Sequence, residues 1–196
     1  MSSISVAGDT SGSVTLQAPA VAGSTVLTLP AVSGTVLVSN TSVITSATAK
    51  ASTSGTSIDF TGIPSWAKRI TVMLSGVSTN GTSNLQIQLG SGSITTSGYT
   101  STAASTYGAG TAINTSTAGL ISTVEIQAAG VLFGNAIICL QNSSNGFTSS
   151  SVLSGNSRMQ YASGGVTLSG TLDRVRITTV NGTDVFDAGS INIMYE

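Results

Sequence analysis

Short runs in which apolar and polar residues alternate recur through the chain from residue 58 to its end. The alternation is clearest in the last quarter, where Val175 and Ile177 alternate with arginines and Ile191 and Ile193 flank an asparagine. A period of two residues is typical of strands that are buried on one face. The pattern predicts strands at 56–60, 68–77, 83–90, 121–129, 131–140, 157–162, 165–169, 172–180 and 188–195.

Turn-forming dipeptides separate several of these runs. Asn80-Gly81 and Asn181-Gly182 are of the kind that closes β-hairpins, and Asn145-Gly146 marks another turn. No stretch of the domain repeats with the period of an α-helix. The short strands therefore predict an all-β fold, a jelly-roll-like antiparallel β-sandwich over residues 58–196, whose strand order the pattern does not determine.

The first part of the chain follows a different pattern, an eleven-residue repeat over 12–44. Each unit starts with a glycine, continues with a short β-rich run and then breaks before a small residue followed by valine. Glycine in every unit and proline in two of them exclude a helical coiled coil, so each unit is predicted to be a short strand with a corner. The glycines should occupy equivalent turns, because glycine tolerates positive φ. The predicted turn positions are Gly12, Gly23, Gly34, Pro19 and Pro30.

Residues 45–57 show no periodicity and are predicted to form a linker. The chain thus divides into an N-terminal arm with its linker, 1–57, and a β-sandwich domain, 58–196. Short strand units cannot bury their faces alone and must stack on each other or on other chains. We therefore expect residues 12–44 to be buried between copies of the chain or against a partner protein.

The composition indicates a surface that is rich in hydroxyl groups and poor in charge. Ser and Thr account for 63 of the 196 residues, whereas charged residues make up only 7%. The hydrophobic fraction of 40% is nevertheless sufficient for a core. A net charge of −1 provides no electrostatic footprint for nucleic acid. So little charge protects a free monomer poorly against association, which favours a subunit covered by neighbours.

The sequence offers few groups for catalysis or metal binding. It contains no histidine, which excludes histidine-based triads and most zinc sites. The single cysteine, Cys139, lies in the most apolar stretch and is expected to be a buried, inert thiol. Asp173, Asp184 and Asp187 could form a glycosidase pair or a calcium site. Turn capping and pairing with nearby arginines is the simpler interpretation, so no catalytic residue, metal or cofactor is predicted.

Aromatic side chains are few, and most fall within or beside predicted strands. Those expected in the core are Phe60, Phe133, Phe186 and Trp66. Tyr99 and Tyr107 lie in residues 91–118, the longest polar stretch of the domain, which is predicted to be a loop. Exposed rings there could stack on a sugar, or they could pack the loop onto the sandwich, which is the commoner behaviour of tyrosine.

Three segments resemble sequences of fibre and appendage proteins of tailed bacteriophages. Residues 11–38 resemble a repeat near the N-terminus of many such fibres. Residues 59–90 and 170–196 resemble the opening and closing strands of a β domain in the same proteins. The segments cover about half of the chain and carry no catalytic residues to transfer. The resemblance implies a homotrimer attached through its N-terminus, with the C-terminal domain outermost.

The expected function is that of a structural protein of the virion, a trimeric tail fibre or appendage, and not an enzyme. Its arm would dock onto other virion proteins, and Tyr99 and Tyr107 would contact host surface polysaccharide through three combined weak sites. A capsid decoration or head-fibre protein is the alternative, since the chain is shorter than many fibres, and a polysaccharide-degrading enzyme is disfavoured. The N-terminus lacks an export signal and no apolar run is long enough to span a bilayer, so synthesis in the host cytoplasm without membrane insertion is expected.

Overall fold

The computed structural model describes residues 3–17, 44–108, 110–155 and 157–196, together with a few positions between residues 20 and 31. The chain divides into two compact units, Met1–Thr41 and Ser42–Glu196. Every regular element among the described residues is a β-strand, and each strand pairs with its neighbours in antiparallel fashion. The all-β class expected from the alternation of apolar and polar residues is confirmed.

The first unit contains a β-hairpin of β1 (Ser3–Ala7) and β2 (Ser13–Gln17). The turn is closed by a hydrogen bond of 2.9 Å from the Gly8 amide to the Gly12 carbonyl. The exposed large apolar side chains of the hairpin are Ile4, Val6, Val14 and Leu16. An isolated two-stranded hairpin is at best marginally stable in water, so this one needs a further surface to bury its side chains.

Two glycines of the eleven-residue repeat have the backbone conformation that a turn role requires. Gly12 has a φ of +80° and Gly23 a φ of +58°, in the region that residues with a Cβ rarely adopt. Gly34, Pro19 and Pro30 lie outside the described residues. The equivalence of all three repeat units therefore stays a prediction.

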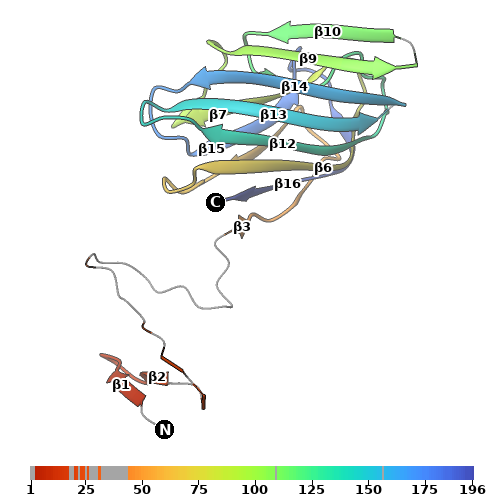
Figure 1. The fold of residues 1–196 in the computed structure, drawn as a ribbon. Coiled ribbons are helices and arrows are strands. Elements are labelled where there is room, and N and C mark those ends of the chain that lie inside the picture. Colours follow the sequence, from red (N-terminus) through yellow and green to blue (C-terminus); the bar gives the residue numbers. More distant parts are fainter. Residues whose placement is uncertain are drawn as a thin grey trace. The chain divides into compact units, whose positions relative to one another are not determined.

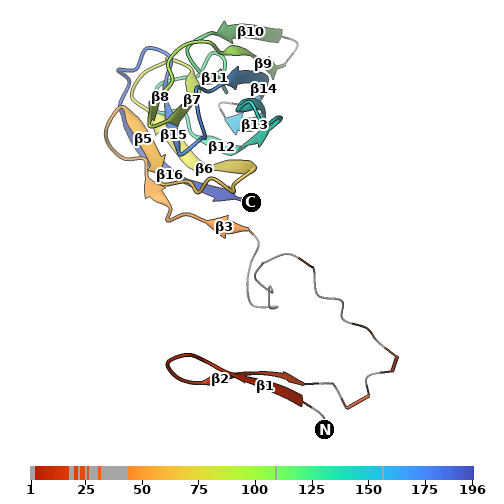
Figure 2. The same cartoon turned by 90° about the vertical axis from the view of Figure 1, so that its left-hand side faces the viewer.

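The second unit is a sandwich of two antiparallel sheets, which Figure 2 shows as separate layers. In order across the large sheet, the strands are β10 (Gly110–Ser116), β9 (Thr100–Tyr107), β14 (Arg158–Thr167), β13 (Gly146–Gly155), β12 (Leu132–Leu140), β6 (Arg69–Thr79), β16 (Phe186–Tyr195) and β3 (Thr45–Ser46), with β4 (Lys50–Ala51) also on β16. The small sheet contains β11 (Leu120–Ile121), β7 (Leu85–Ser91), β15 (Arg174–Thr179) and β5 (Ser57–Thr61), with β8 (Ser93–Ile94) on β7. Figure 1 looks onto the large sheet.

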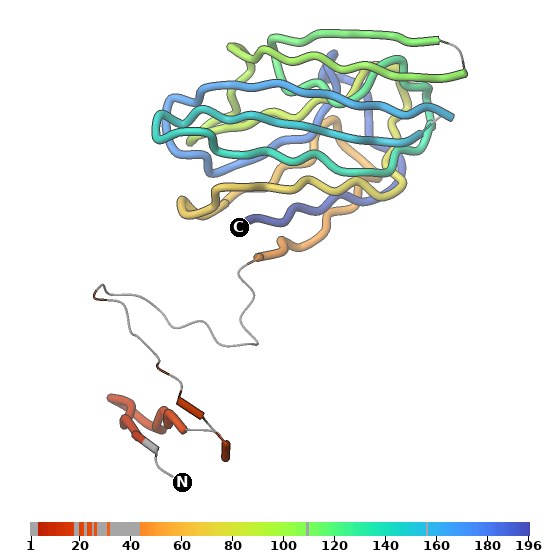
Figure 3. The backbone as a smooth tube through the Cα atoms, in the orientation of Figure 1, coloured from red at the N-terminus to blue at the C-terminus, as the bar shows by residue number. Residues whose placement is uncertain are grey.

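The core lies between the two sheets and is built by the predicted alternation. Val175 and Ile177 on β15 are buried while the arginines between and before them are not, and Ile191 and Ile193 on β16 are buried in the same way. Some neighbouring strands of the large sheet come from distant parts of the chain. Figure 3 traces β16 alongside β6, although the two strands lie near opposite ends of the domain's sequence. The chain must therefore be nearly complete before β16 can pair with β6.

Strands with strong hydrophobic alternation were predicted well, and strands rich in hydroxyl groups were not. The segments 157–162 and 165–169 form one continuous strand, β14, and of the segment 121–129 only Ile121 lies in a strand, as the last residue of β11. Strands β9, β10 and β13 were not predicted. Their Ser, Thr, Ala and Gly residues carry little hydropathy contrast, and their strand structure comes from pairing with neighbours in the sheet.

The prediction of a linker over residues 45–57 is wrong, because these residues belong to the sandwich. Strands β3 and β4 both pair with β16, and Ser52 is fully buried with its hydroxyl donating to the Ala188 carbonyl at 2.8 Å. The boundary between the two units therefore falls after residue 41 and not after residue 57. These contacts use backbone and hydroxyl groups, so a search for apolar periodicity does not detect them.

Three glycines with positive φ allow irregular pairing at one end of the large sheet. Gly134, Gly76 and Gly189 lie on the neighbouring strands β12, β6 and β16, with φ values of +140°, +64° and +90°. The register shifts at this end in both pairs of strands. Such bulges bend a strand and increase its twist. A Cβ at position 189 would overlap the carbonyl oxygen of Gly76, so the backbones approach too closely here for any side chain.

Candidate functional site

The predicted loop over residues 91–118 is largely a β-hairpin, formed by β9 and β10. Tyr99 lies just before β9 and Tyr107 ends it. Eight residues of extended chain separate two side chains by about 26 Å at roughly 3.3 Å per residue. The two tyrosines therefore lie at opposite ends of the strand and cannot form one binding loop, which corrects the expectation from the sequence.

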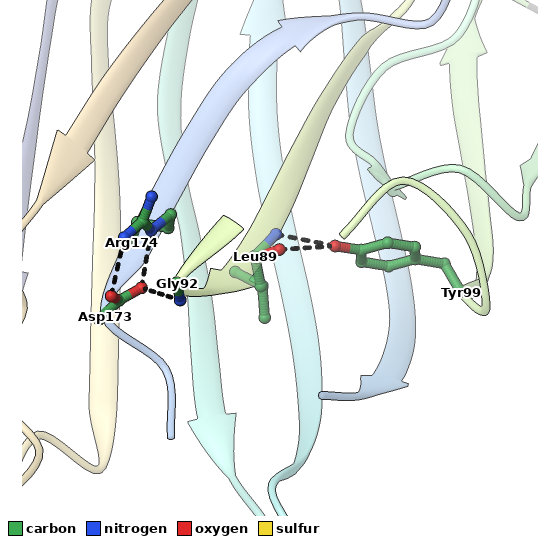
Figure 4. Close-up of polar contacts among 5 residues, drawn as sticks. All are labelled: Leu89, Gly92, Tyr99, Asp173 and Arg174. Atoms are coloured by element: carbon green, nitrogen blue, oxygen red, sulfur yellow. Dashed lines mark hydrogen bonds and ion pairs between the residues drawn. The ribbon is translucent and has the colours of Figure 1, made fainter. Parts of the chain in front are cut away.

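Tyr99 is a core residue and not an exposed ring. Its side chain is 2% exposed, and its hydroxyl accepts a hydrogen bond from the Leu89 amide at 2.8 Å and donates to the Thr95 carbonyl at 3.0 Å. Figure 4 shows the ring reaching from its own segment to β7. Burial raises the pKa of Tyr99 to about 12. The packing alternative therefore holds for this residue, because a sugar cannot reach its ring.

Tyr107 is accessible, with 39% of its surface exposed. The guanidinium carbon of Arg158 lies 3.8 Å from the centroid of its ring, and Arg158 also forms an ion pair of 2.7 Å with Glu125. On the neighbouring strand, a Cβ at Gly110 would come within 2.9 Å of the ring, so the glycine leaves room for it. The ring therefore lies between Arg158, with which it makes a cation–π contact, and Gly110, which leaves space for it.

Beside this pair lies an open hollow of about 400 Å³ at the ends of β9, β13 and β14. The residues with side chains that line it are Thr106, Tyr107, Ser154, Ser157, Arg158 and Met159. These groups can donate hydrogen bonds to neutral or acidic oxygens and can contact apolar carbon. They include no paired carboxylates and no base beside a nucleophile. The hollow is therefore suited to weak binding of a polar ligand.

Asp173 has a local structural role. Its carboxylate accepts from the Gly92 amide at 3.1 Å and forms two hydrogen bonds with the Arg174 guanidinium, at 2.8 and 2.9 Å, as Figure 4 shows. The hydrogen bonds from Arg174 hold the pKa of Asp173 below its usual value. The second arginine of the strand, Arg176, pairs instead with Asp59. Asp173 thus caps a turn and pairs with its neighbour.

Asp184 and Asp187 also bind groups of their own surroundings. Asp184 accepts from the Ser83 amide at 2.9 Å and from the Asn181 side chain at 2.6 Å, and Asp187 accepts from the Ser78 hydroxyl. Within the described part of the chain, no three Asp, Glu, His or Cys residues come together in a group that could hold a metal ion. Each of the two carboxylates is therefore engaged by hydrogen bonds from its own surroundings.

Two aromatic residues expected in the core are not buried. Trp66 is exposed and packs against Tyr195, with ring centroids 5.6 Å apart, and Phe133 is exposed on the outer face of β12. Phe60 and Phe186 are buried as expected. The run that contains Phe133, in β12, has apolar residues on both faces of the strand. Its sequence therefore did not indicate which of these residues point outward.

The outer face of the large sheet has a chemical character that the sequence did not reveal. Strands β9, β10, β12, β13 and β14 contain one charged residue, Arg158, whose side chain is paired with Glu125. The exposed large apolar side chains on these strands, besides Tyr107, are Ile113, Phe133, Val152, Met159 and Tyr161. Contiguous exposed apolar side chains mark surfaces that contact other proteins or ligands.

Comparison with protein-family models, with curated proteins and with solved structures finds no match to this chain. Among the described residues, no helix is long and apolar enough to cross a membrane. What this protein does must therefore be inferred from the chemistry of its two units and of their surfaces.

Proposed function

We propose that the chain is a structural subunit of a tailed-bacteriophage virion, a homotrimeric fibre or appendage. The observation that carries this proposal is the outer face of β9, β10, β12, β13 and β14 in the large sheet, which is broad, almost uncharged and partly apolar. Such a surface favours association over a free monomer. The resemblance of residues 11–38, 59–90 and 170–196 to appendage proteins directs the proposal to a virion.

The hairpin of β1 and β2 supports attachment through the N-terminal unit. It presents apolar side chains on both strands, and Val6 lies directly opposite Val14. A hairpin with this surface gains stability when another protein covers it. In the proposed function, that protein is another protein of the virion.

The assembly state provides the direct test. Sedimentation of the full chain should give a particle of three chains of 19.4 kDa each at micromolar concentration. Val14→Asp should leave this trimer intact but prevent its incorporation into phage particles, because a charge in the hairpin opposes burial. A stable wild-type monomer would contradict the proposal.

Host contact is assigned to the hollow beside Tyr107 and Arg158, without Tyr99. Sugar hydroxyls can accept hydrogen bonds from the guanidinium and from the serine and threonine hydroxyls that line it. Each site is open and shallow, so useful affinity requires several copies on one particle.

Replacing Arg158 by Ala should therefore reduce adsorption of phage to host cells by at least about tenfold, since three weakened sites act together. Trp66→Ala is the matched control, because it removes an exposed aromatic side chain that does not line the hollow. Equal adsorption of both variants, with trimers intact, would show that the hollow has no part in host binding.

A further inference from the structure

We propose that the outer face of β10, β9, β14, β13 and β12 is the surface through which copies of this chain meet. The inference rests on the proposed homotrimer and identifies the part of the molecule that forms it. Its starting point is one row of side chains that crosses the large sheet.

The row follows directly from the strand register. Ile113 lies opposite Ala104, Ala104 opposite Tyr161, and Tyr161 opposite Val152. Side chains opposite each other on neighbouring strands are about 5 Å apart, so these four form a continuous band. Ile113 is 69% exposed and Val152 is 54% exposed. This band leaves large apolar side chains in water.

Residues on either side of the band give the face the layout of an interface. On one side, Phe133 adds an exposed apolar side chain, and Ser154 and Met159, its neighbours across the sheet, border the hollow beside Tyr107, which stays open at the rim of the interface. On the other side the row is Thr102, Ser163, Ser150. An apolar centre beside hydroxyl groups resembles the dry core and polar rim of protein interfaces.

The size of the face is adequate for one specific contact. Five strands spaced by about 4.8 Å, each presenting about eight residues at 3.3 Å, cover roughly 600 Å² before side-chain relief is counted. Specific interfaces bury about 600–1,000 Å² on each partner. The face therefore reaches the lower end of this range only when all five strands take part, and in a trimer it is shared between contacts with two neighbours.

The lack of charge on this face indicates that its partner is a second copy of the chain. Around a three-fold axis, each subunit can turn the same face inward, so a residue near the axis meets its own copies. A charged residue there would face like charges, whereas Val152 and Tyr161 face apolar groups. A partner of opposite charge would find no charged group to recognise on these strands other than Arg158, which is already paired. The same uncharged face thus suits self-association better than binding of a charged protein.

The test places a carboxylate in the middle of the face. Val152→Glu should weaken the trimer. The protein concentration below which it dissociates should rise by at least about 100-fold, because several carboxylates would be buried close together. Val180→Glu is the matched control, since Val180 is 45% exposed but follows β15 on the small sheet. Sedimentation equilibrium of the full chain measures both variants, and circular dichroism verifies that they are folded.

The possible results separate this inference from the proposed function. A monomeric wild-type chain contradicts the homotrimer itself. Trimers in the wild type and in both variants overturn the assignment of the face, and copies then meet elsewhere, for example through the N-terminal unit. Dissociation of the Val152→Glu trimer alone supports the assignment. If that variant does not fold, Ile113→Glu in the same row decides by the same criterion.

Discussion

Replacing Gly189 by Ala is expected to lower the free energy of unfolding of the sandwich by about 3–4 kcal/mol. The residue has a φ of +90°, which costs an L-residue about 1–2 kcal/mol, and the new Cβ would overlap the Gly76 carbonyl oxygen. That oxygen belongs to the backbone of β6 and cannot move unless the pairing with β16 shifts. For a domain of this size, the melting temperature should fall by about 10 °C, measurable by calorimetry.

Gly182→Ala is the matched control for this prediction. Gly182 also has a positive φ, +69°, but no atom lies within 4 Å of a Cβ placed there. Only the backbone cost remains, so a loss of about 1 kcal/mol is expected. If both variants lost the same stability, the close approach of β6 and β16 at their bulge would be refuted.

Replacing Tyr99 by Phe is expected to destabilise the sandwich by about 1–3 kcal/mol. The change keeps the ring but removes the hydroxyl, which leaves the buried amide of Leu89 without its acceptor. Tyr107→Phe removes a hydroxyl from an exposed ring and should change stability by less than about 0.5 kcal/mol. Urea unfolding of the three proteins measures the difference. A neutral effect at Tyr99 would contradict its burial beside β7.

The same hydroxyl makes stability depend on alkaline pH. Burial raises the pKa of Tyr99 to about 12, above its value near 10 in the unfolded chain. The associated stability is fully present below pH 10 and is lost as pH rises towards 12, because the unfolded chain ionises first. The stability difference between the wild type and Tyr99→Phe should therefore shrink by the order of 2 kcal/mol over this interval. A constant difference would argue against the raised pKa.

The sequence alone determined the fold class and the core strands with clear alternation. Val175, Ile177, Ile191 and Ile193 point into the core as their spacing predicted. A period of two in hydrophobicity is a local property, and burial of one sheet face requires it wherever it occurs. The low charge of the sequence likewise predicts a surface that associates with other subunits, and this stays a prediction.

Only the tertiary structure decided which polar residues are buried and which apolar residues are exposed. Tyr99 and Tyr107 lie in the same polar segment, yet one is held in the core and the other is accessible beside Arg158. The hydroxyl-rich strands β9 and β13 exist because neighbouring strands satisfy their backbone groups. Val152 is exposed because its neighbour Leu153 points into the core from the opposite face of β13. Each of these outcomes depends on partners far away in the chain, and a local pattern contains no information on which strands will become neighbours.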